Sequence, residues 1–296
     1  MAEFQEFQNN IFPETLELDM FDTDISDSFD DIVVDDAVTA DSMDYGYSKY
    51  NMSSISHSDN IMADVAHSMT GMMKRIRDLF IKYKELTFNI KPMGFKHTGL
   101  FPEQAVNWDW MINKIKEETK KKNREIKVLN LFAYTGGASV ACSYAGASVC
   151  HVDSSKGMVA WAKENIVSSG LSDRPVRFII DDVTKFVQRE IRRGNKYDAI
   201  IMDPPSYGRG KNGEVWQFES NLEDLVELCS KVLSDNPLFF LINSYTTGIS
   251  SKVLENILSL KIKNAKGKIT SGEIGLPMTD SSLVLPCGIY GRWEKK

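Results

Sequence analysis

The chain has 296 residues, 42% hydrophobic and 26% charged, which is typical of one large globular domain or two small ones. No apolar stretch reaches the roughly 18 residues that a membrane span needs, and the acidic N-terminus lacks the pattern of a signal or transit peptide. The four cysteines have no CxxC spacing and no histidine cluster beside them: Cys142, Cys150, Cys229 and Cys287. We therefore expect a cytoplasmic protein with reduced thiols, no metal site and no membrane association.

The net charge of −6 is divided unevenly along the chain. Residues 1–70 hold 16 acidic residues and one basic residue, Lys49, which amounts to −15. Residues 71–296 hold 34 basic and 25 acidic residues, which amounts to +9. A basic domain attracts polyanions, and nucleic acid is the usual one.

The N-terminal part is expected to differ in order from the rest. Residues 1–60 are rich in Asp, Ser, Met and Asn without a helical or strand period, so we expect an acidic, disordered tail. Residues 61–82 show apolar residues at helical spacing, which predicts a linking helix that packs on the domain or contacts RNA. A folded domain is expected over residues 83–296.

That domain begins with a predicted strand at 86–90 and an amphipathic helix at 107–122. Strands are then predicted at 126–132, 148–152, 176–180, 198–202 and 238–242, alternating with helices at 138–145, 155–168, 183–193, 222–233 and 252–260. Two final strands, 269–274 and 289–293, lack a helix between them. The alternation predicts a Rossmann-like α/β fold: a seven-stranded, mostly parallel sheet with an antiparallel edge strand.

The most informative segment is Asp203-Pro204-Pro205-Ser206-Tyr207, which follows the apolar run 197–202. Two prolines end the strand and hold the backbone extended. A carboxylate, a rigid carbonyl and an aromatic ring are thereby presented at the carboxyl end of a strand, where ligands bind in open α/β sheets.

Earlier strand ends carry further candidate residues. Gly136-Gly137 stands at a strand-to-helix turn, where glycine allows close approach of a ligand or simply starts a helix. There is no GxGxxG, so a nucleoside with a small tail fits better than a pyrophosphate. Asp153, 16 residues after Gly137, can accept both ribose hydroxyls or cap a helix. In Asp181-Asp182, one carboxylate can accept from an adenine amino group while its neighbour caps the next helix.

With these motifs the chain resembles class I S-adenosylmethionine-dependent methyltransferases, nearest to the RlmI/RlmK-like ribosomal RNA methyltransferases, over about residues 82–296. The residues that carry the resemblance are 132–137, His151-Val152-Asp153, Asp181-Asp182-Val183, 203–207 and a preceding segment, Gly99-Leu100-Phe101-Pro102-Glu103-Gln104. The chain departs from the family at Ala105, where an arginine is common. The family's RNA-binding domain, which normally precedes the catalytic domain, is not recognisable.

The resemblance implies S-adenosylmethionine as cofactor and RNA as partner. It implies cofactor binding by a set of residues at the strand ends: Gln104, Tyr134, Thr135, Gly136, Gly137, Asp153, Asp182 and Asp203. Tyr134, Thr135 and Gly136 would border the methionine part. Asp153 would hold the ribose, Asp182 the adenine, and Gln104 would close over the cofactor. Asp203 and Pro204 would lie beside the transferred methyl group as catalytic residues.

Tyr207 is the third catalytic candidate, because it can stack on a base, with packing on the sheet as the alternative. Methylation at carbon 5 of cytosine would need a cysteine after the fourth or fifth strand, and Ser206 and 243–246 stand there instead. We therefore predict direct methyl transfer to a base nitrogen, with an oxygen as the alternative acceptor. The cationic loop 208–213 contacts substrate or is an ordinary solvated loop.

Two other functions compete with this one. The acidic tail could act as a nucleic-acid mimic in a catalytically silent or autoinhibited protein. A nicotinamide-dependent oxidoreductase is disfavoured by the missing glycines. The sequence makes no prediction of the oligomeric state.

Overall fold

The structure is a computed structural model, and it describes residues 79–91, 98–209, 215–262, 266–279 and 281–296. The acidic tail predicted for residues 1–60 lies outside these ranges, as does nearly all of the linking helix. The last residues of that helix were predicted wrongly, because Phe80–Tyr83 forms strand β1. It pairs antiparallel with β2 (Leu86–Asn89), and this ladder, with Tyr83 buried, outweighs the helical spacing.

The main sheet has seven strands in the order β10-β11-β9-β6-β3-β4-β5. Their bounds are β3 (Lys127–Leu131), β4 (Ser148–Asp153), β5 (Val176–Ile180), β6 (Ala199–Met202), β9 (Phe239–Ser244), β10 (Gly267–Pro277) and β11 (Val284–Lys295). The five strands from β3 to β9 pair in parallel, and β11 is antiparallel to both of its neighbours. The predicted mostly parallel, seven-stranded sheet is confirmed, with the antiparallel pair at one edge.

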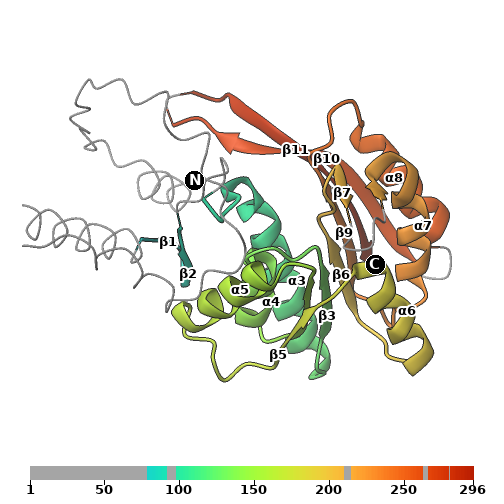
Figure 1. The fold of residues 1–296 in the computed structure, drawn as a ribbon, viewed down its shortest axis with the longest axis horizontal. Helices are drawn as coiled ribbons and strands as arrows, with labels where there is room; N and C mark the ends of the chain where they lie inside the picture. The colour runs from blue at the N-terminus through green and yellow to red at the C-terminus, as the bar shows by residue number, and fades with distance from the viewer. Residues whose placement is uncertain (1–78, 92–97, 210–214, 263–265, 280) are drawn as a thin grey trace, which may run out of the picture. The chain divides into compact units, whose positions relative to one another are not determined.

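Within the described ranges, six helices cover the two faces of this sheet (Figure 1). One face carries α3 (Ala105–Lys122), α4 (Gly137–Tyr144) and α5 (Lys156–Ser168), and the other carries α6 (Val183–Arg193), α7 (Phe218–Ser230) and α8 (Ser251–Lys261). All were predicted to within a few residues. A short 3₁₀ helix, η2 (Pro102–Gln104), precedes α3.

The helices on both faces explain why the central strands read as unbroken apolar runs. Every residue of β6 and β9 is buried. Successive side chains enter two separate cores, so that Val128 packs under α3 and α4 and Leu129 packs under α6 and α7. Burial of each such side chain contributes about 1.5–3 kcal/mol to folding.

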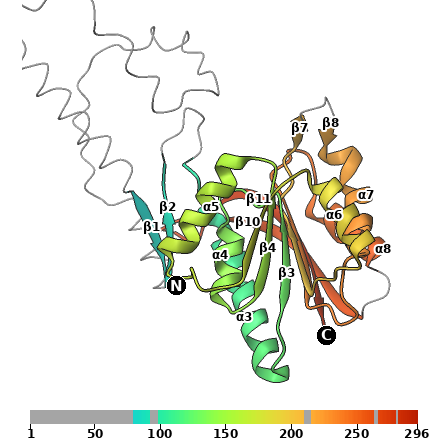
Figure 2. The same ribbon diagram turned by 60° about the horizontal axis from the view of Figure 1, so that its bottom comes forward.

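The parallel strands all end at the same edge of the sheet, which we call the carboxyl edge. The chain winds from β3 to β4 in one direction and places β6 on the other side of β3, which creates a switch point where ligands bind in such sheets. A small hairpin, β7 (Tyr207–Arg209) and β8 (Val215–Gln217), stands beyond this edge (Figure 2). None of the helices in the described ranges is both long and apolar enough to span a membrane.

Candidate active site

A cavity of about 370 Å³ opens at the carboxyl edge, beside the ends of β3, β4, β6 and β9. Most of the predicted site residues line it: Gln104, Tyr134, Thr135, Gly137, Asp153, Asp203 and Pro204. Gly136, Asp182 and Tyr207 do not line it. The topology thus brings together side chains from residues 104 to 204 at one place.

The turn after β3 contains backbone conformations that residues other than glycine rarely adopt. Phe132 and Tyr134 have positive φ angles of 53° and 48°. Such conformations cost of order 1–3 kcal/mol each and gather at functional sites. The Tyr134 amide donates to Asp153 Oδ2 at 2.8 Å, and the Ala133 amide donates to the Val152 carbonyl at 3.1 Å. These bonds from β4 hold the turn in place.

Packing explains the two glycines of this turn. Gly136 has a φ of +84°, and a Cβ on it would lie 2.9 Å from the Cβ of Ala162 on α5. A Cβ on Gly137 would lie 3.0 Å from the indole ring of Trp108. Gly136 therefore serves the close contact of turn and helix, and only Gly137 borders the cavity.

Asp153 ends β4 with both carboxylate oxygens engaged but not saturated. Oδ2 accepts from the Tyr134 amide and Oδ1 from the Ser155 amide, both at 2.8 Å. A carboxylate has about four lone-pair sites, so Asp153 keeps acceptor capacity for a ligand. Burial raises the pKa of this carboxyl group, and the backbone hydrogen bonds oppose that rise. The helix cap that was the alternative role is supplied by Ser155, whose hydroxyl accepts from the Met158 amide.

Thr135 and Gln104 tie the segment before α3 to the sheet. The Thr135 hydroxyl donates to the Gly99 carbonyl at 2.6 Å, so it is engaged within the protein. Gln104 Nε2 donates to the Tyr245 hydroxyl at 2.7 Å, and its Oε1 accepts from Asn107 at 2.7 Å. Asn107 also donates to Asn243 Oδ1 at 2.9 Å, which completes a buried chain of hydrogen bonds across the cavity wall.

Asp203 follows β6 and is the most strongly perturbed acid of the cavity. Burial, and then the nearby charge of Glu103, raise its pKa to about 7. The corner after it is braced twice, because the Pro205 carbonyl accepts from Trp216 Nε1 at 2.6 Å and the Ser206 and Thr246 hydroxyls lie 2.8 Å apart. A carboxyl group is thereby held at the cavity in a rigid turn.

Besides Gly136, two predicted residues do not line the cavity. Asp182 is exposed and caps α6, where its Oδ1 accepts from the Lys185 amide at 2.8 Å. Tyr207 is 50% exposed on β7, and its hydroxyl accepts from Arg209 Nε at 2.7 Å. The Arg209 guanidinium lies 6.0 Å from the centre of the Tyr207 ring, which stays half exposed beyond the edge of the sheet. Their proposed contacts with ligand stay predictions.

One wall of the cavity, made of aromatic rings and an amide side chain, was not predicted from the sequence. Phe101 lies between Tyr134 and Tyr245, with ring centroids 5.6 and 5.5 Å apart, and all three line the cavity with Asn243. Burial and the charges of Asp203 and Glu103 raise the pKa of Tyr245. Its hydroxyl therefore stays protonated and can donate or accept a hydrogen bond. The available signal was position, since 243–246 follows the fifth parallel strand. In the described ranges, no group of three or more potential ligand side chains could hold a metal ion.

Comparison with known proteins finds a matching family model, similar curated proteins and similar solved structures. A family model described as S-adenosylmethionine-dependent methyltransferase matches residues 76–255. The ribosomal RNA large subunit methyltransferase K/L of Shewanella frigidimarina is 34% identical over 151 residues, which cover 50% of this chain and 20% of that protein. This chain thus spans about a fifth of the length of such curated relatives.

Solved structures agree with the family model. A SAM-dependent methyltransferase from Agrobacterium tumefaciens is 38% identical with a TM-score of 0.68, and the match covers 74% of this chain and 70% of that one. A methyltransferase complexed with SAH has a TM-score of 0.61 at 20% identity, covering 73% of this chain and 56% of that one. At that identity the second likeness concerns the fold alone.

Proposed function

The chain belongs to the S-adenosylmethionine-dependent methyltransferase family, and from this we propose that it methylates RNA at a base nitrogen by direct transfer. The observation that carries the proposal is the position of Asp203 and Pro204. They border the same cavity as Asp153, across the switch point of the sheet. One part of the cavity can therefore hold a nucleoside while another faces an incoming base.

The residues of the cavity fit the cofactor. Its volume of about 370 Å³ lies in the range of small-molecule sites. Asp153 offers free lone pairs for ribose hydroxyls, and aromatic rings line the walls. Two carboxylates, Asp153 and Asp203, suit a ligand that carries positive charge. When bound, S-adenosylmethionine supplies an electrophilic methyl group on a sulfonium.

The protein's own part in the reaction is positioning. In its ionised form Asp203 can accept a hydrogen bond from a nucleobase amine, and the Pro204 carbonyl can accept a second. Orientation of this kind contributes on the order of 7–11 kcal/mol to lowering a barrier. Because burial and the charge of Glu103 raise the pKa of Asp203 to about 7, both protonation states of the ligand-free protein would be populated near neutral pH.

The cysteines support transfer to nitrogen over carbon 5. None of the four lines the cavity, and Cys142, Cys150 and Cys229 are buried elsewhere. Burial raises the pKa of each, and burial together with the charge of Glu103 raises that of Cys287. None of these cysteines therefore supplies a thiolate nucleophile to the cavity for a covalent intermediate.

RNA as the substrate is supported by the names of the relatives and by the +9 charge of residues 71–296. The exposed ring of Tyr207 could stack on a base next to the cavity, a contact worth about 1–3 kcal/mol. All four thiols are free, which fits the reducing cytoplasm as the proposed location.

The test is incubation of the full chain with labelled S-adenosylmethionine and unmodified ribosomal RNA transcripts, followed by identification of the labelled nucleotide. Asp203→Ala should lose labelling even at saturating cofactor, and Cys287→Ser should label normally. A label at carbon 5 of a pyrimidine, or normal turnover of Asp203→Ala, would contradict the proposal.

A further inference from the structure

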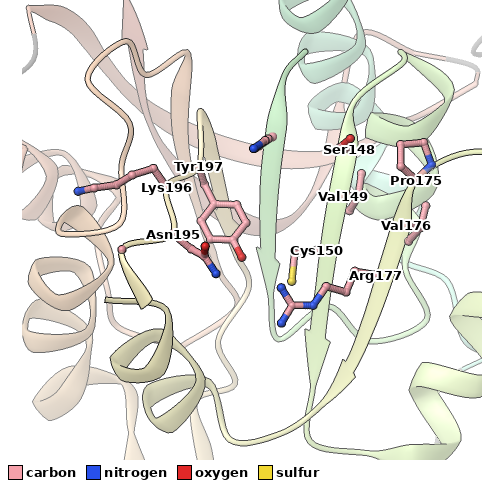
Figure 3. A pocket seen from close by; sticks show the side chains of 11 residues that line it. Ser148, Val149, Cys150, Pro175, Val176, Arg177, Asn195, Lys196 and Tyr197 are labelled. Carbon is pink, nitrogen blue, oxygen red and sulfur yellow. The ribbon is translucent and has the colours of Figure 1, made fainter. Parts of the chain in front are cut away.

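A second and larger cavity, of about 620 Å³, lies at the amino edge of the sheet (Figure 3). Lys127, Ser148 and Val176 line it, and each is the first residue of its strand, β3, β4 and β5 respectively. The candidate active site lies at the other ends of β3 and β4. With about 3.3 Å per residue, β4 separates the two cavities by roughly 17 Å.

The charges facing this cavity are positive. Arg177 on β5 points its guanidinium into it, toward Cys150 and Tyr197 (Figure 3). Lys127 lines it from β3 and is exposed. Lys196 lines it too, although its ammonium donates to the Lys231 carbonyl at 2.8 Å. Arg177 and Lys127 therefore make the cavity a place where an anion is favoured, whereas the Lys196 ammonium points away from it (Figure 3).

The acidic groups beside the cavity are engaged within the protein. Glu125 accepts from the Ser148 hydroxyl, and Asp198 accepts from Arg124 at 2.7 Å and from the Lys127 amide at 2.9 Å. Glu190 is fully buried and accepts from the Tyr197 hydroxyl at 2.7 Å, from Asn195 at 2.8 Å and from Arg193 at 3.0 Å. Arg177 lies farther off, 3.8 Å from the same carboxylate. Glu190 therefore keeps its hydrogen bonds whether or not Arg177 turns to a ligand. The negative end of α6 also points here, and Arg192 and Arg193 in its last turn offset it.

The remaining walls are apolar or neutral. Val149, Pro175 and Val176 form one side, and the Tyr197 ring and Asn195 form the other (Figure 3). An acidic peptide would use the cations but leave these walls without a partner. A nucleotide offers a phosphate group for the cations and a flat, largely apolar base or sugar for the walls.

We propose that the amino-edge cavity binds the phosphate ester and adjoining sugar or base of a nucleotide, with an RNA strand as its source. The cavity then serves as a second RNA contact, which increases affinity without taking part in methyl transfer. This rests on the proposed function only in the choice of RNA over a free nucleotide. The same chemistry would recognise either source, and the experiment separates them.

The test compares the full chain with Lys127→Gln/Arg177→Gln and with a control of equal charge change, Lys252→Gln/Lys266→Gln. Both control residues are exposed and lie outside the cavity. The probe is a fluorescein-labelled, single-stranded 20-nucleotide RNA, followed by anisotropy between 50 and 250 mM KCl. Inorganic phosphate and adenosine monophosphate are titrated in separate experiments by calorimetry.

The cavity variant should bind the RNA about tenfold more weakly at low salt, and its salt slope should fall by about 1.4, or about 0.7 for each lost phosphate contact. The control should change neither. In methylation assays the variant should raise KM for RNA and leave kcat and cofactor affinity unchanged, because the active site lies at the other edge.

Equal RNA binding by variant and control would overturn the proposal. Binding of adenosine monophosphate that only the variant loses, with RNA affinity at the control value, would assign the cavity to free nucleotides and also overturn it. Tighter RNA binding by the variant would do the same, since it would indicate that the acidic segment 1–70 occupies the cavity. If no RNA is methylated by the unaltered chain, the proposed function fails, but the binding arms still decide the cavity.

Discussion

Replacing Asp203 with asparagine should stabilise the folded protein above neutral pH, although it removes an acceptor from the candidate active site. Burial and the charge of Glu103 raise the pKa of Asp203 from an ordinary 3.8 to about 7. The ionised carboxylate is therefore costly in the folded state. Asparagine has the same shape and carries no charge, so it avoids that cost.

The size of the gain follows from the two pKa values. Their difference of about three corresponds to about 4 kcal/mol, at about 1.4 kcal/mol for each pKa unit. Because the folded state holds this proton more tightly than the unfolded state, the stability that Asp203 contributes is present below pH 3.8 and is lost as the pH rises to about 7. The advantage of asparagine should grow over that window and then stay constant.

The assay is urea unfolding at pH 5.5, 7 and 8.5 without cofactor, because a bound cation would lower the pKa of Asp203. The free energy of unfolding of Asp203→Asn should exceed that of the unaltered chain by about 2 kcal/mol at pH 5.5 and about 4 kcal/mol at pH 8.5. Asp224→Asn, an exposed substitution, should change little at any pH. An equal gain at all three pH values, or a loss at pH 8.5, would refute the reasoning.

Three further outcomes are expected. In pH–rate profiles, kcat/KM for RNA should rise with pH through about 7 as Asp203 ionises. Glu103→Gln should move this rise to lower pH, because it removes the charge that raises the pKa of Asp203. Asp153→Asn should weaken cofactor binding about 10- to 100-fold in calorimetry, since a hydrogen bond to a charged group contributes about 1.5–3 kcal/mol; an unchanged affinity would exclude Asp153 from the site. Gly136→Ala should destabilise the protein by about 2 kcal/mol or more, because of its φ of +84° and the contact with Ala162, and calorimetry should find a Tm lower by about 4–8 °C.

The fold could be read from the sequence to within a few residues for most elements. Buried parallel strands need short apolar runs, and helices on both faces need amphipathic segments. The alternation of these two kinds of segment along the chain therefore predicts the alternation of strands and helices. The misses fall where the local pattern is weak. Strands β7 and β8 have three residues each, and β1 has four. Such elements depend on their partners more than on their own sequence.

The candidate site was predicted unevenly for the same reason. Asp153 and Asp203 were found because an acid directly after an apolar strand is visible in one dimension. Phe101 and Tyr245 were missed as a pair, since 144 positions separate them and only folding puts their rings 5.5 Å apart. Asp182 carries the same local signal as Asp153, yet its carboxylate caps α6.

The order of apolar and polar residues along the chain determined the layered sheet and its parallel strands, because these follow from local periodicity. It also determined the edge at which the acidic residues gather, because parallel strands end at the same edge of a sheet. Tertiary structure alone decided which acids face the cavity, how high the pKa of Asp203 rises, and that basic residues from β3 and β5 meet at the opposite edge. Those properties depend on burial and on distances between remote residues, and both come into being only when the layers pack.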